Sequence, residues 1–196
     1  MVLDSGDFSC NLHPALCNLF FMISPTWIRF QWKTTTLPSL PQCDSRLIIR
    51  NATPAEQSSI LKVTLLALSM NTDWHDGTHE VQELIEAAVK KAFSAEKEPS
   101  CLVAAHGSRI IAASLLDYNP ETTNHLTSGP WVLAEYRNRG IGTALLWSSL
   151  QRLGDHGITS AFGITRKNSI AAKFIYPKFG GTIEHLSAPI QKELVF

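Results

Sequence analysis

The alternation of apolar and polar residues becomes regular from residue 47 onward. The segment Leu47-Ile48-Ile49-Arg50 is typical of a short strand. Next comes Thr53-Pro54-Ala55-Glu56, which combines a Thr-x-x-Glu capping box with proline at the first helical position. This start predicts a helix that ends near residue 69. The apolar positions of a second predicted helix share one face: Val81, Leu84, Ile85, Ala88 and Ala92.

Two apolar runs, 101–106 and 109–116, flank the dipeptide Gly107-Ser108 and predict a β-hairpin. Further elements are predicted as a strand over about 125–133, a helix over 143–153, a strand over 158–165, a short helix over 169–176 and one or two closing strands over 182–196. Gly129-Pro130 interrupts the first of these strands, and a bulge or splay is expected there because proline removes a ladder donor. This order predicts an α/β fold with a mixed sheet.

Residues 1–45 differ from the rest, with few charges, several aromatic residues and no regular helix or strand period. We expect an N-terminal extension of unknown role, either disordered or packed on a domain that covers residues 46–196. A lid over a functional site is the alternative for this segment.

Composition excludes several classes of function. Lysine plus arginine and aspartate plus glutamate both number 17, so no general attraction to nucleic acid or to a membrane surface is expected. The four cysteines, Cys10, Cys17, Cys43 and Cys101, have neither metal-site nor disulfide-framework spacing. Reduced thiols fit a cytoplasmic protein, with a nuclear location left open. The apolar run 19–23 is far shorter than the ~20 residues that span a bilayer.

The segment Arg137-Asn138-Arg139-Gly140-Ile141-Gly142 lies between an extended apolar run and a predicted helix. Glycines at such a turn let the backbone approach an anion closely, and the free N–H groups of the first helical turn point toward it. Arg137 and Arg139 would add cationic donors beside it. This segment therefore predicts a phosphate-binding loop.

Two well-known phosphate loops do not fit this segment. Gly142 is followed by Thr143-Ala144, without the lysine that a Walker A loop requires. A dinucleotide fingerprint needs glycine or alanine where Leu145 stands, and an acidic residue about 20 positions further on, where Gly163-Ile164-Thr165 is found.

The remaining pattern, Arg-x-x-Gly-x-Gly at Arg137, Gly140 and Gly142, resembles the signature of the GNAT superfamily of acetyl-CoA-dependent N-acyltransferases. A second block resembles the family's Asn-x-x-Ala…Tyr…Gly segment, with Asn168, Ala171, Phe174, Tyr176 and Gly180. The resemblance covers about 47–196. It implies a GNAT fold, in which the sheet splays beside the motif strand, helices flank both faces, and the cofactor's pantetheine arm enters the gap.

The resemblance also implies a set of cofactor contacts. In the family, backbone groups of the motif strand align the arm, and Asn168 matches a cofactor-contacting asparagine, although it could equally cap the short helix. The implied cofactor-binding residues are Val132, Leu133, Arg137, Asn138, Arg139, Gly140, Ile141, Gly142, Thr143 and Asn168.

Tyr176 would be the general acid toward the leaving thiolate, but Ile175 separates it from Phe174, whereas the family places tyrosine directly after that position. His125 is the candidate base, or a solvated histidine at a strand end. Trp74 and His75 lie in the loop that borders the acceptor site in the family, so the resemblance implies that Trp74 or His75 contacts the substrate. Gly77 disfavours the helix that would align His75 with His79, and the chemistry requires no metal, so none is expected.

We therefore expect an N-acetyltransferase that moves an acetyl group from acetyl-CoA to a primary amine, favouring a small-molecule acceptor, by direct attack in a ternary complex. The alternatives are a protein lysine or N-terminal acetyltransferase and a non-catalytic acyl-CoA-binding module. No nucleic-acid or membrane partner is expected, and the protein could be a monomer or a homodimer.

Overall fold

The computed structural model describes residues 27–42, 44, 46–94 and 98–184. Within them, one four-stranded sheet has the order β2-β3-β4-β5 and one three-stranded sheet has the order β6-β1-β7, with every pairing antiparallel. The strands are β1 (Trp27–Lys33), β2 (Leu47–Asn51), β3 (Cys101–His106), β4 (Arg109–Leu115), β5 (Ser128–Val132), β6 (Ser160–Arg166) and β7 (Thr182–Glu184).

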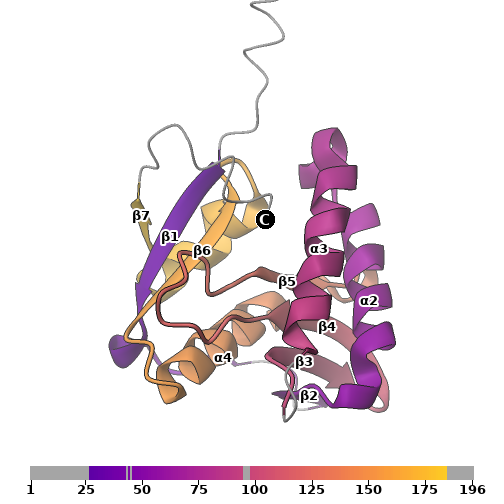
Figure 1. Ribbon diagram of the computed structural model, residues 1–196, viewed down its shortest axis with the longest axis horizontal. Helices are drawn as coiled ribbons and strands as arrows, with labels where there is room; N and C mark the ends of the chain where they lie inside the picture. Colours follow the sequence, from indigo (N-terminus) through magenta and orange to yellow (C-terminus); the bar gives the residue numbers. More distant parts are fainter. Residues whose placement is uncertain (1–26, 43, 45, 95–97, 185–196) are drawn as a thin grey trace, which may run out of the picture.

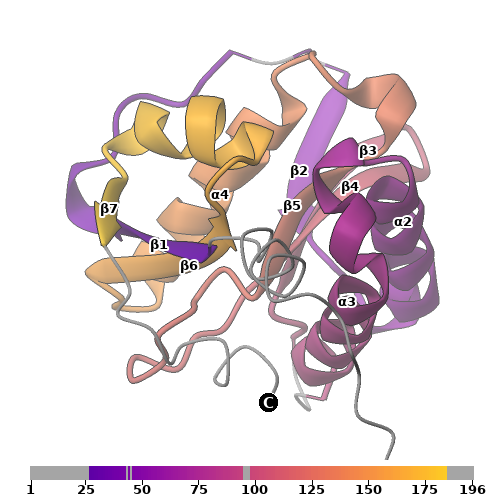
Figure 2. The ribbon, with the colours of Figure 1, turned by 90° about the horizontal axis from the view of Figure 1, so that it is seen from above.

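The helices are α2 (Gln57–Ser69), α3 (Thr78–Ala92) and α4 (Ile141–Asp155). Short turns are η1 (Thr34–Thr36), η2 (Pro54–Glu56), η3 (Thr72–Gly77), η4 (Ala134–Tyr136), η5 (Ala171–Ile175) and η6 (Tyr176–Phe179). Helices α2 and α3 lie side by side on one face of the larger sheet, and α4 covers the other face (Figures 1 and 2). The predicted α/β class with helices on both faces is confirmed, although two antiparallel sheets replace the single mixed sheet.

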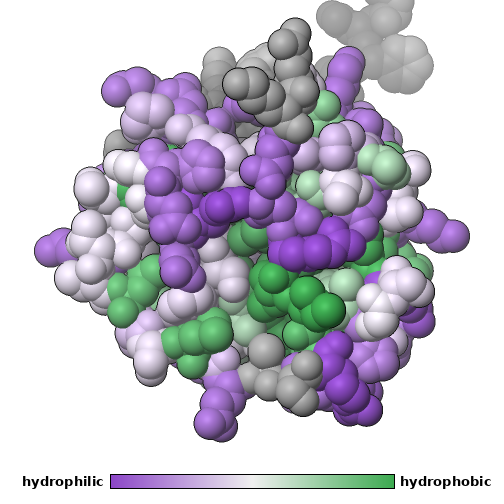
Figure 3. Space-filling view, turned by 90° about the horizontal axis from the view of Figure 1, so that it is seen from below, coloured by the Kyte–Doolittle hydropathy of each residue, from purple (hydrophilic) through white to green (hydrophobic). Residues whose placement is uncertain are grey.

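Two hydrophobic clusters fill the spaces between these layers. One joins α4 to the smaller sheet and includes Phe30, Trp32, Leu145 and Tyr176. The other lies between the helices α2 and α3 and the larger sheet. Strand β3 contributes to both clusters, and its first five residues are buried, as expected for a strand covered on both faces. On the outside, a hydrophobic group lies near the middle of the face seen from below, and hydrophilic side chains border it above (Figure 3).

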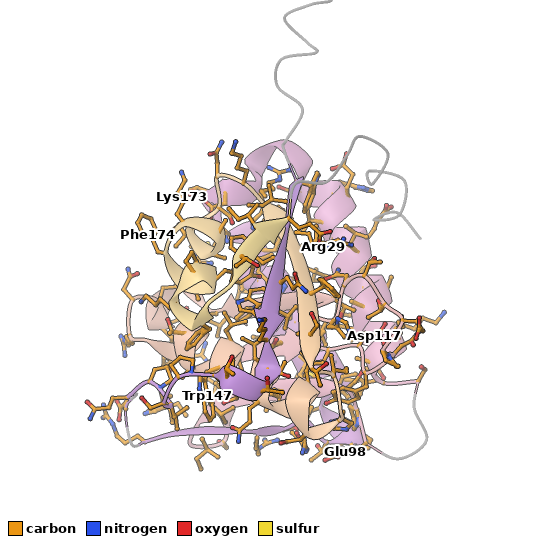
Figure 4. All side chains as sticks on the ribbon, turned by 90° about the vertical axis from the view of Figure 1, so that its left-hand side faces the viewer. Arg29, Glu98, Asp117, Trp147, Lys173 and Phe174 are labelled. Carbon is orange, nitrogen blue, oxygen red and sulfur yellow. The ribbon has the colours of Figure 1, made fainter. Side chains whose placement is uncertain are left out.

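Strand β1 corrects the expected domain boundary at residues 45 and 46. It lies between β6 and β7 in the smaller sheet, so this part of the expected extension belongs to the fold (Figure 1). Its residues Ile28, Phe30 and Trp32 are buried and alternate with more exposed neighbours. The segment that follows β1 also contacts α4. The indole N–H of Trp147, which is labelled in Figure 4, donates to the carbonyl oxygen of Pro38 at 2.7 Å. Residues 1–26 of the expected extension lie outside the described residues.

Strand β5 begins later than predicted, because the chain changes partners between Leu126 and Ser128. The backbone N–H groups of His125 and Leu126 both donate to the carbonyl oxygen of Phe162 on β6, whereas Ser128 and Trp131 pair with β4. The predicted irregularity at Gly129-Pro130 is confirmed as a register shift in the pairing of β4 with β5. A Cβ at Gly129, whose φ is +107°, would lie 2.8 Å from a backbone oxygen of β4, so only glycine fits there. The two sheets therefore diverge beyond this point.

Candidate functional site

A cavity of about 810 Å³ opens where β5 and β6 diverge. Its walls come from β5, from the start of α4, from the side of α3 with η3, and from the segment that follows β6. Strands and helices that are far apart in the sequence therefore face a single space, which is the arrangement expected of a ligand site.

The glycine-rich segment forms one wall of this cavity, at the N-terminus of α4. Gly140 is the residue before the helix, and its φ of +76° is a left-handed conformation that glycine adopts without strain. The first intrahelical bond is donated by the N–H of Ala144 to the carbonyl of Gly140, at 2.9 Å. Ahead of it, the N–H groups of Ile141, Gly142 and Thr143 have no partner inside the helix, and all three residues line the cavity. This wall can hold an anion through its backbone.

The arginine side chains do not serve as the expected cationic donors. Arg137 donates through Nε to the carbonyl oxygen of Val132 at 3.1 Å, and through Nη1 and Nη2 to those of Met70 and Ala67 at 2.7 Å each. It thus ties β5 to the C-terminal end of α2. Arg139 donates to the carbonyl of Glu135 and lies over the ring of Tyr136. Asn138, with a φ of 60°, turns the loop and lines the cavity.

Of the two predicted strand residues, Val132 and Leu133, only Val132 directs its backbone N–H toward the cavity. The N–H of Leu133 donates to the carbonyl of Ile111 on β4 at 3.0 Å, and its side chain is 2% exposed. Because the bonds of an antiparallel ladder alternate, the N–H of Val132 points away from β4, toward the gap between the sheets. Val132 lines the cavity, whereas Leu133 does not, which corrects the second assignment.

Asn168 has neither of the roles that the sequence suggested. It is exposed in the turn after β6, and the cavity is lined instead by its neighbours Ser169 and Ile170. The cap of the following helix is Ser169, whose hydroxyl accepts a bond from the N–H of Ala172 at 3.1 Å. A second bond, 3.1 Å long, joins this hydroxyl to that of Thr165. The helix start is therefore one residue later than the asparagine.

Tyr176 lies in the cavity wall, with its side chain directed toward β5. Its hydroxyl donates to the carbonyl oxygen of Gly129 at 3.4 Å. The ring packs edge-on against Phe30 and Trp32, with ring centroids 5.1 and 5.0 Å away. Burial raises the pKa of the hydroxyl, which therefore stays protonated at neutral pH. A protonated hydroxyl at this place can act as a proton donor.

The one-residue shift before Tyr176 has a structural explanation. The preceding segment Ala171–Ile175 is a π-helix, which holds one residue more per turn than an α-helix does. The π-helix therefore absorbs the additional Ile175, and Tyr176 still points inward. Lys173 and Phe174 lie on the outer side of this segment, and Phe174, which is 64% exposed, lies at the edge of the cavity (Figure 4).

His125 does not reach the cavity, which corrects its assignment as a candidate base. It is completely buried rather than solvated, and its Nδ1 accepts a bond from the N–H of Phe162 at 3.1 Å. A ring nitrogen that accepts this bond carries no proton, so the imidazole is neutral. Burial lowers the pKa of His125, partly opposed by the Asp117 carboxylate. The histidine fixes the loop before β5 onto β6.

Trp74 lines the cavity, and it has aromatic neighbours that were not expected from the sequence. Trp27 lies 5.7 Å away and Trp131 lies 6.0 Å away, measured between ring centroids. The alternation of β1 was the signal that could have included Trp27 in the fold. The side chain of His75 lies outside the described residues. Among the residues described, no cluster of three or more histidine, cysteine, aspartate or glutamate side chains could hold a metal ion.

In the described part of the chain, no helix combines the length and the apolar character needed to cross a membrane. No match was found among curated proteins. The solved structures do contain similar folds, at sequence identities that show the fold alone.

One similar structure is a GCN5-related N-acetyltransferase from Sphaerobacter thermophilus, with 17% identity, a TM-score of 0.58, and coverage of 88% of this chain and 54% of that chain. Another is a functionally unknown conserved protein from Staphylococcus epidermidis, with 14% identity, a TM-score of 0.57, and coverage of 89% and 65%. This chain thus spans between about half and two thirds of their lengths. The profile of the acetyltransferase (GNAT) family matches residues 66–180, which is more than half of the sequence, and the chain belongs to this family.

Proposed function

We propose that the protein is an N-acetyltransferase that transfers the acetyl group of acetyl-CoA to the primary amine of a small molecule. The observation that carries this proposal is that the N-terminal residues of α4 and Tyr176 line the same cavity. An anchor for a pyrophosphate and a proton donor for a thiolate are the two protein groups that the reaction needs most.

The anchor fits the pyrophosphate because it is built from backbone. The N–H groups of Ile141, Gly142 and Thr143 would hold the phosphates, and the N–H of Val132 would align the pantetheine arm. A Cβ at Gly142 would be 3.5 Å from Val132 and 3.9 Å from Ile175, so the wall leaves room for little more than this atom. Acetyl-CoA supplies the acetyl group as a reactive thioester.

Tyr176 is the proposed acid. Its raised pKa keeps the proton on the oxygen at neutral pH, so that a proton is available to the thiolate as it leaves. The carbonyl oxygen of Gly129 holds the hydroxyl at the point where β5 and β6 diverge. At this position the gap between the two sheets opens, and the pantetheine arm of acetyl-CoA would extend into that gap.

The described carboxylates of the cavity wall are already engaged. Asp117 forms an ion pair with Lys91 at 2.8 Å, and Oδ2 of Asp73 accepts a bond from the N–H of Ile170 at 3.0 Å. With His125 also placed elsewhere, we infer that the attacking amine loses its proton to water rather than to a dedicated side chain.

A small-molecule acceptor is favoured over a protein by the way η3 is held. The carbonyl of Asp73 accepts a bond from Arg166 on β6 at 3.1 Å, and its carboxylate binds the start of the segment after β6. These bonds join two walls of the cavity, which leaves less open space for a polypeptide to pass through. Acetylation of a protein lysine or N-terminus is the competing function.

Release of free thiol from acetyl-CoA, measured across a panel of small amines and lysine-containing peptides, tests the proposal. Turnover with a small amine at a higher kcat/KM than with any peptide is the expected result. Preferred turnover of a peptide would favour the protein acetyltransferase. Tight binding of CoA by calorimetry, together with no turnover on any amine or peptide, would establish the non-catalytic acyl-CoA-binding module instead.

A further inference from the structure

Three tryptophans from three separate elements meet on the cavity wall. Trp27 comes from β1, Trp74 from η3 and Trp131 from β5, and consecutive ring centroids are 5.7 and 6.0 Å apart. Trp74 is 9% exposed and Trp131 is 8% exposed, so the rings belong to the packed wall rather than to the outer surface. The indole N–H of Trp131 already donates to the hydroxyl of Ser128 at 2.7 Å. The polar atom of this ring is therefore satisfied, and its carbon surface faces the ligand space.

Helix α3 extends this apolar wall. Val81, Leu84, Ile85 and Ala88 line the cavity at the spacing of one helical face. Leu84 and Ala88 are only half-buried, so part of their apolar surface is open to the cavity. An occupant that covers them removes apolar surface from water, which is favourable in proportion to the area covered.

Of the two described carboxylates that line the cavity, one forms an ion pair, and a guanidinium lies against the tryptophan rings. Asp117 is neutralised by Lys91, and Asp73 accepts a backbone N–H bond. The guanidinium of Arg166 lies 4.8 Å from the ring centre of Trp74 and 5.8 Å from that of Trp27. A second cation on these rings would be repelled by this guanidinium. The same repulsion favours the neutral form of an incoming amine, which is the form that attacks.

We infer that the acceptor is a monoamine whose amine is joined to an apolar, ring-bearing body, and this inference rests on the proposed function. The ring packs against Trp74 and Trp131, while the open apolar surface of α3 covers the rest of the body. Aromatic rings gain additional stabilisation from tilted or offset contacts with tryptophan. A polyamine would need several unpaired carboxylates, and an amino sugar would need polar partners for its hydroxyl groups, where this wall offers carbon.

Steady-state acetylation of four probes tests this inference: 2-phenylethylamine, cyclohexylmethylamine, spermidine and glucosamine. The two ring-bearing monoamines should have values of kcat/KM at least about tenfold above those of spermidine and glucosamine, since burial of a few apolar carbons gives discrimination of this size. Equal or higher values for spermidine or glucosamine would overturn the inference and leave the proposed acetyltransferase function intact.

A pair of leucine substitutions locates the effect in this wall. Leu84→Gln places an amide in the cavity, whereas Leu66→Gln makes the same change on α2, outside the cavity lining and at a residue that is 45% exposed. Leu84→Gln should lower kcat/KM for 2-phenylethylamine by about tenfold, with unchanged affinity for CoA, and Leu66→Gln should leave both unchanged. Equal effects of the two substitutions on 2-phenylethylamine would contradict the inference.

Calorimetric binding of 2-phenylethylamine to the protein saturated with CoA separates this inference from the proposed function. Binding that Leu84→Gln weakens would support the apolar acceptor wall even if no amine were turned over, in which case the acetyltransferase proposal alone would fail. No detectable binding of 2-phenylethylamine at millimolar concentration would overturn the inference.

Discussion

The hydroxyl of Tyr176 is hydrogen-bonded to the carbonyl oxygen of Gly129, across the gap where the two sheets diverge. This bond joins the segment after β6 to the strand that precedes the glycine-rich loop. It places the proposed acid beside the strand that would align the pantetheine arm. The proton donor and the cofactor strand are thus held at a fixed separation.

Tyr176→Phe should lower kcat by about a hundredfold or more, because a positioned proton donor contributes on this order. The phenylalanine ring keeps the contacts with Phe30 and Trp32, so the free energy of unfolding and the affinity for CoA should change little. Thiol release and calorimetry measure the two effects. Tyr118→Phe is the matched control, since Tyr118 stacks on His156 outside the cavity lining, and the two variants should differ clearly in kcat.

Gly142→Val should weaken CoA binding about tenfold or more, which corresponds to ~1.4 kcal/mol. The branched side chain would project from the wall that has to admit a pyrophosphate, while its Cβ already contacts Val132. Gly142→Ala is the control, because the single methyl is at ordinary contact distance from its neighbours. Calorimetry with CoA compares them, and thermal melting shows whether both variants fold. Unchanged affinity in a folded Gly142→Val protein would refute the anchor.

His125→Asn should retain kcat/KM to within about tenfold, because no proton of the reaction passes through this residue. The asparagine oxygen can accept the N–H of Phe162 in place of Nδ1. A loss of activity of a hundredfold or more, in a variant of native stability, would restore the histidine as a candidate base. Thiol-release kinetics with the preferred amine provide the measurement.

The same residue makes a prediction about stability and pH. Burial lowers the pKa of His125 in the folded state below its unfolded value of about 6.5. As the pH falls through this value, the unfolded chain takes up a proton that the folded histidine refuses, so the free energy of unfolding decreases. His125→Asn lacks this contribution. Urea unfolding at pH 7.5 and pH 5 should therefore show a smaller loss of stability in the variant than in the wild type.

Arg137→Lys should lower the free energy of unfolding by about 1–3 kcal/mol, since a lysine cannot reproduce three bonds to three carbonyl groups. Arg139→Lys, at an exposed residue with one backbone bond, should change it by less than about 0.5 kcal/mol. Urea unfolding of both variants measures the difference. Similar small effects of the two substitutions would show that Arg137 does not hold β5 to α2.

Much of the fold could be predicted because its signals are local. The capping box at Thr53 and Glu56, the turn at Gly107 and the glycine-rich loop are each encoded within a few residues. The roles of the arginine side chains could not be predicted, because the partners of Arg137 on α2 lie about 70 positions earlier. His125 was misassigned for the same reason, since its partner Phe162 becomes a neighbour only in the folded chain.

The alternation of β1 was overlooked among residues 1–45, because the strand stands apart from the segment that resembles the family. Its neighbours β6 and β7 come from the far end of the described chain. The position of Tyr176 relative to the family's motif was hard to predict for a different reason. Counting residues treats every helix as an α-helix, and the π-helix before Tyr176 adds one residue without turning the tyrosine away.

The place of β1 between β6 and β7 also affects the order in which the molecule can assemble. Pairing of residues 27–33 with 160–166 and 182–184 closes a very long loop. Such non-local contacts form late, because the chain loses the entropy of the closed loop before the contacts can stabilise it. The larger sheet and its helices use shorter connections and can form earlier during synthesis. Phe30 and Trp32 belong to β1, so they pack against the ring of Tyr176 only once β1 has paired. The loop that would bind the cofactor can therefore be complete before the proposed acid is locked in place.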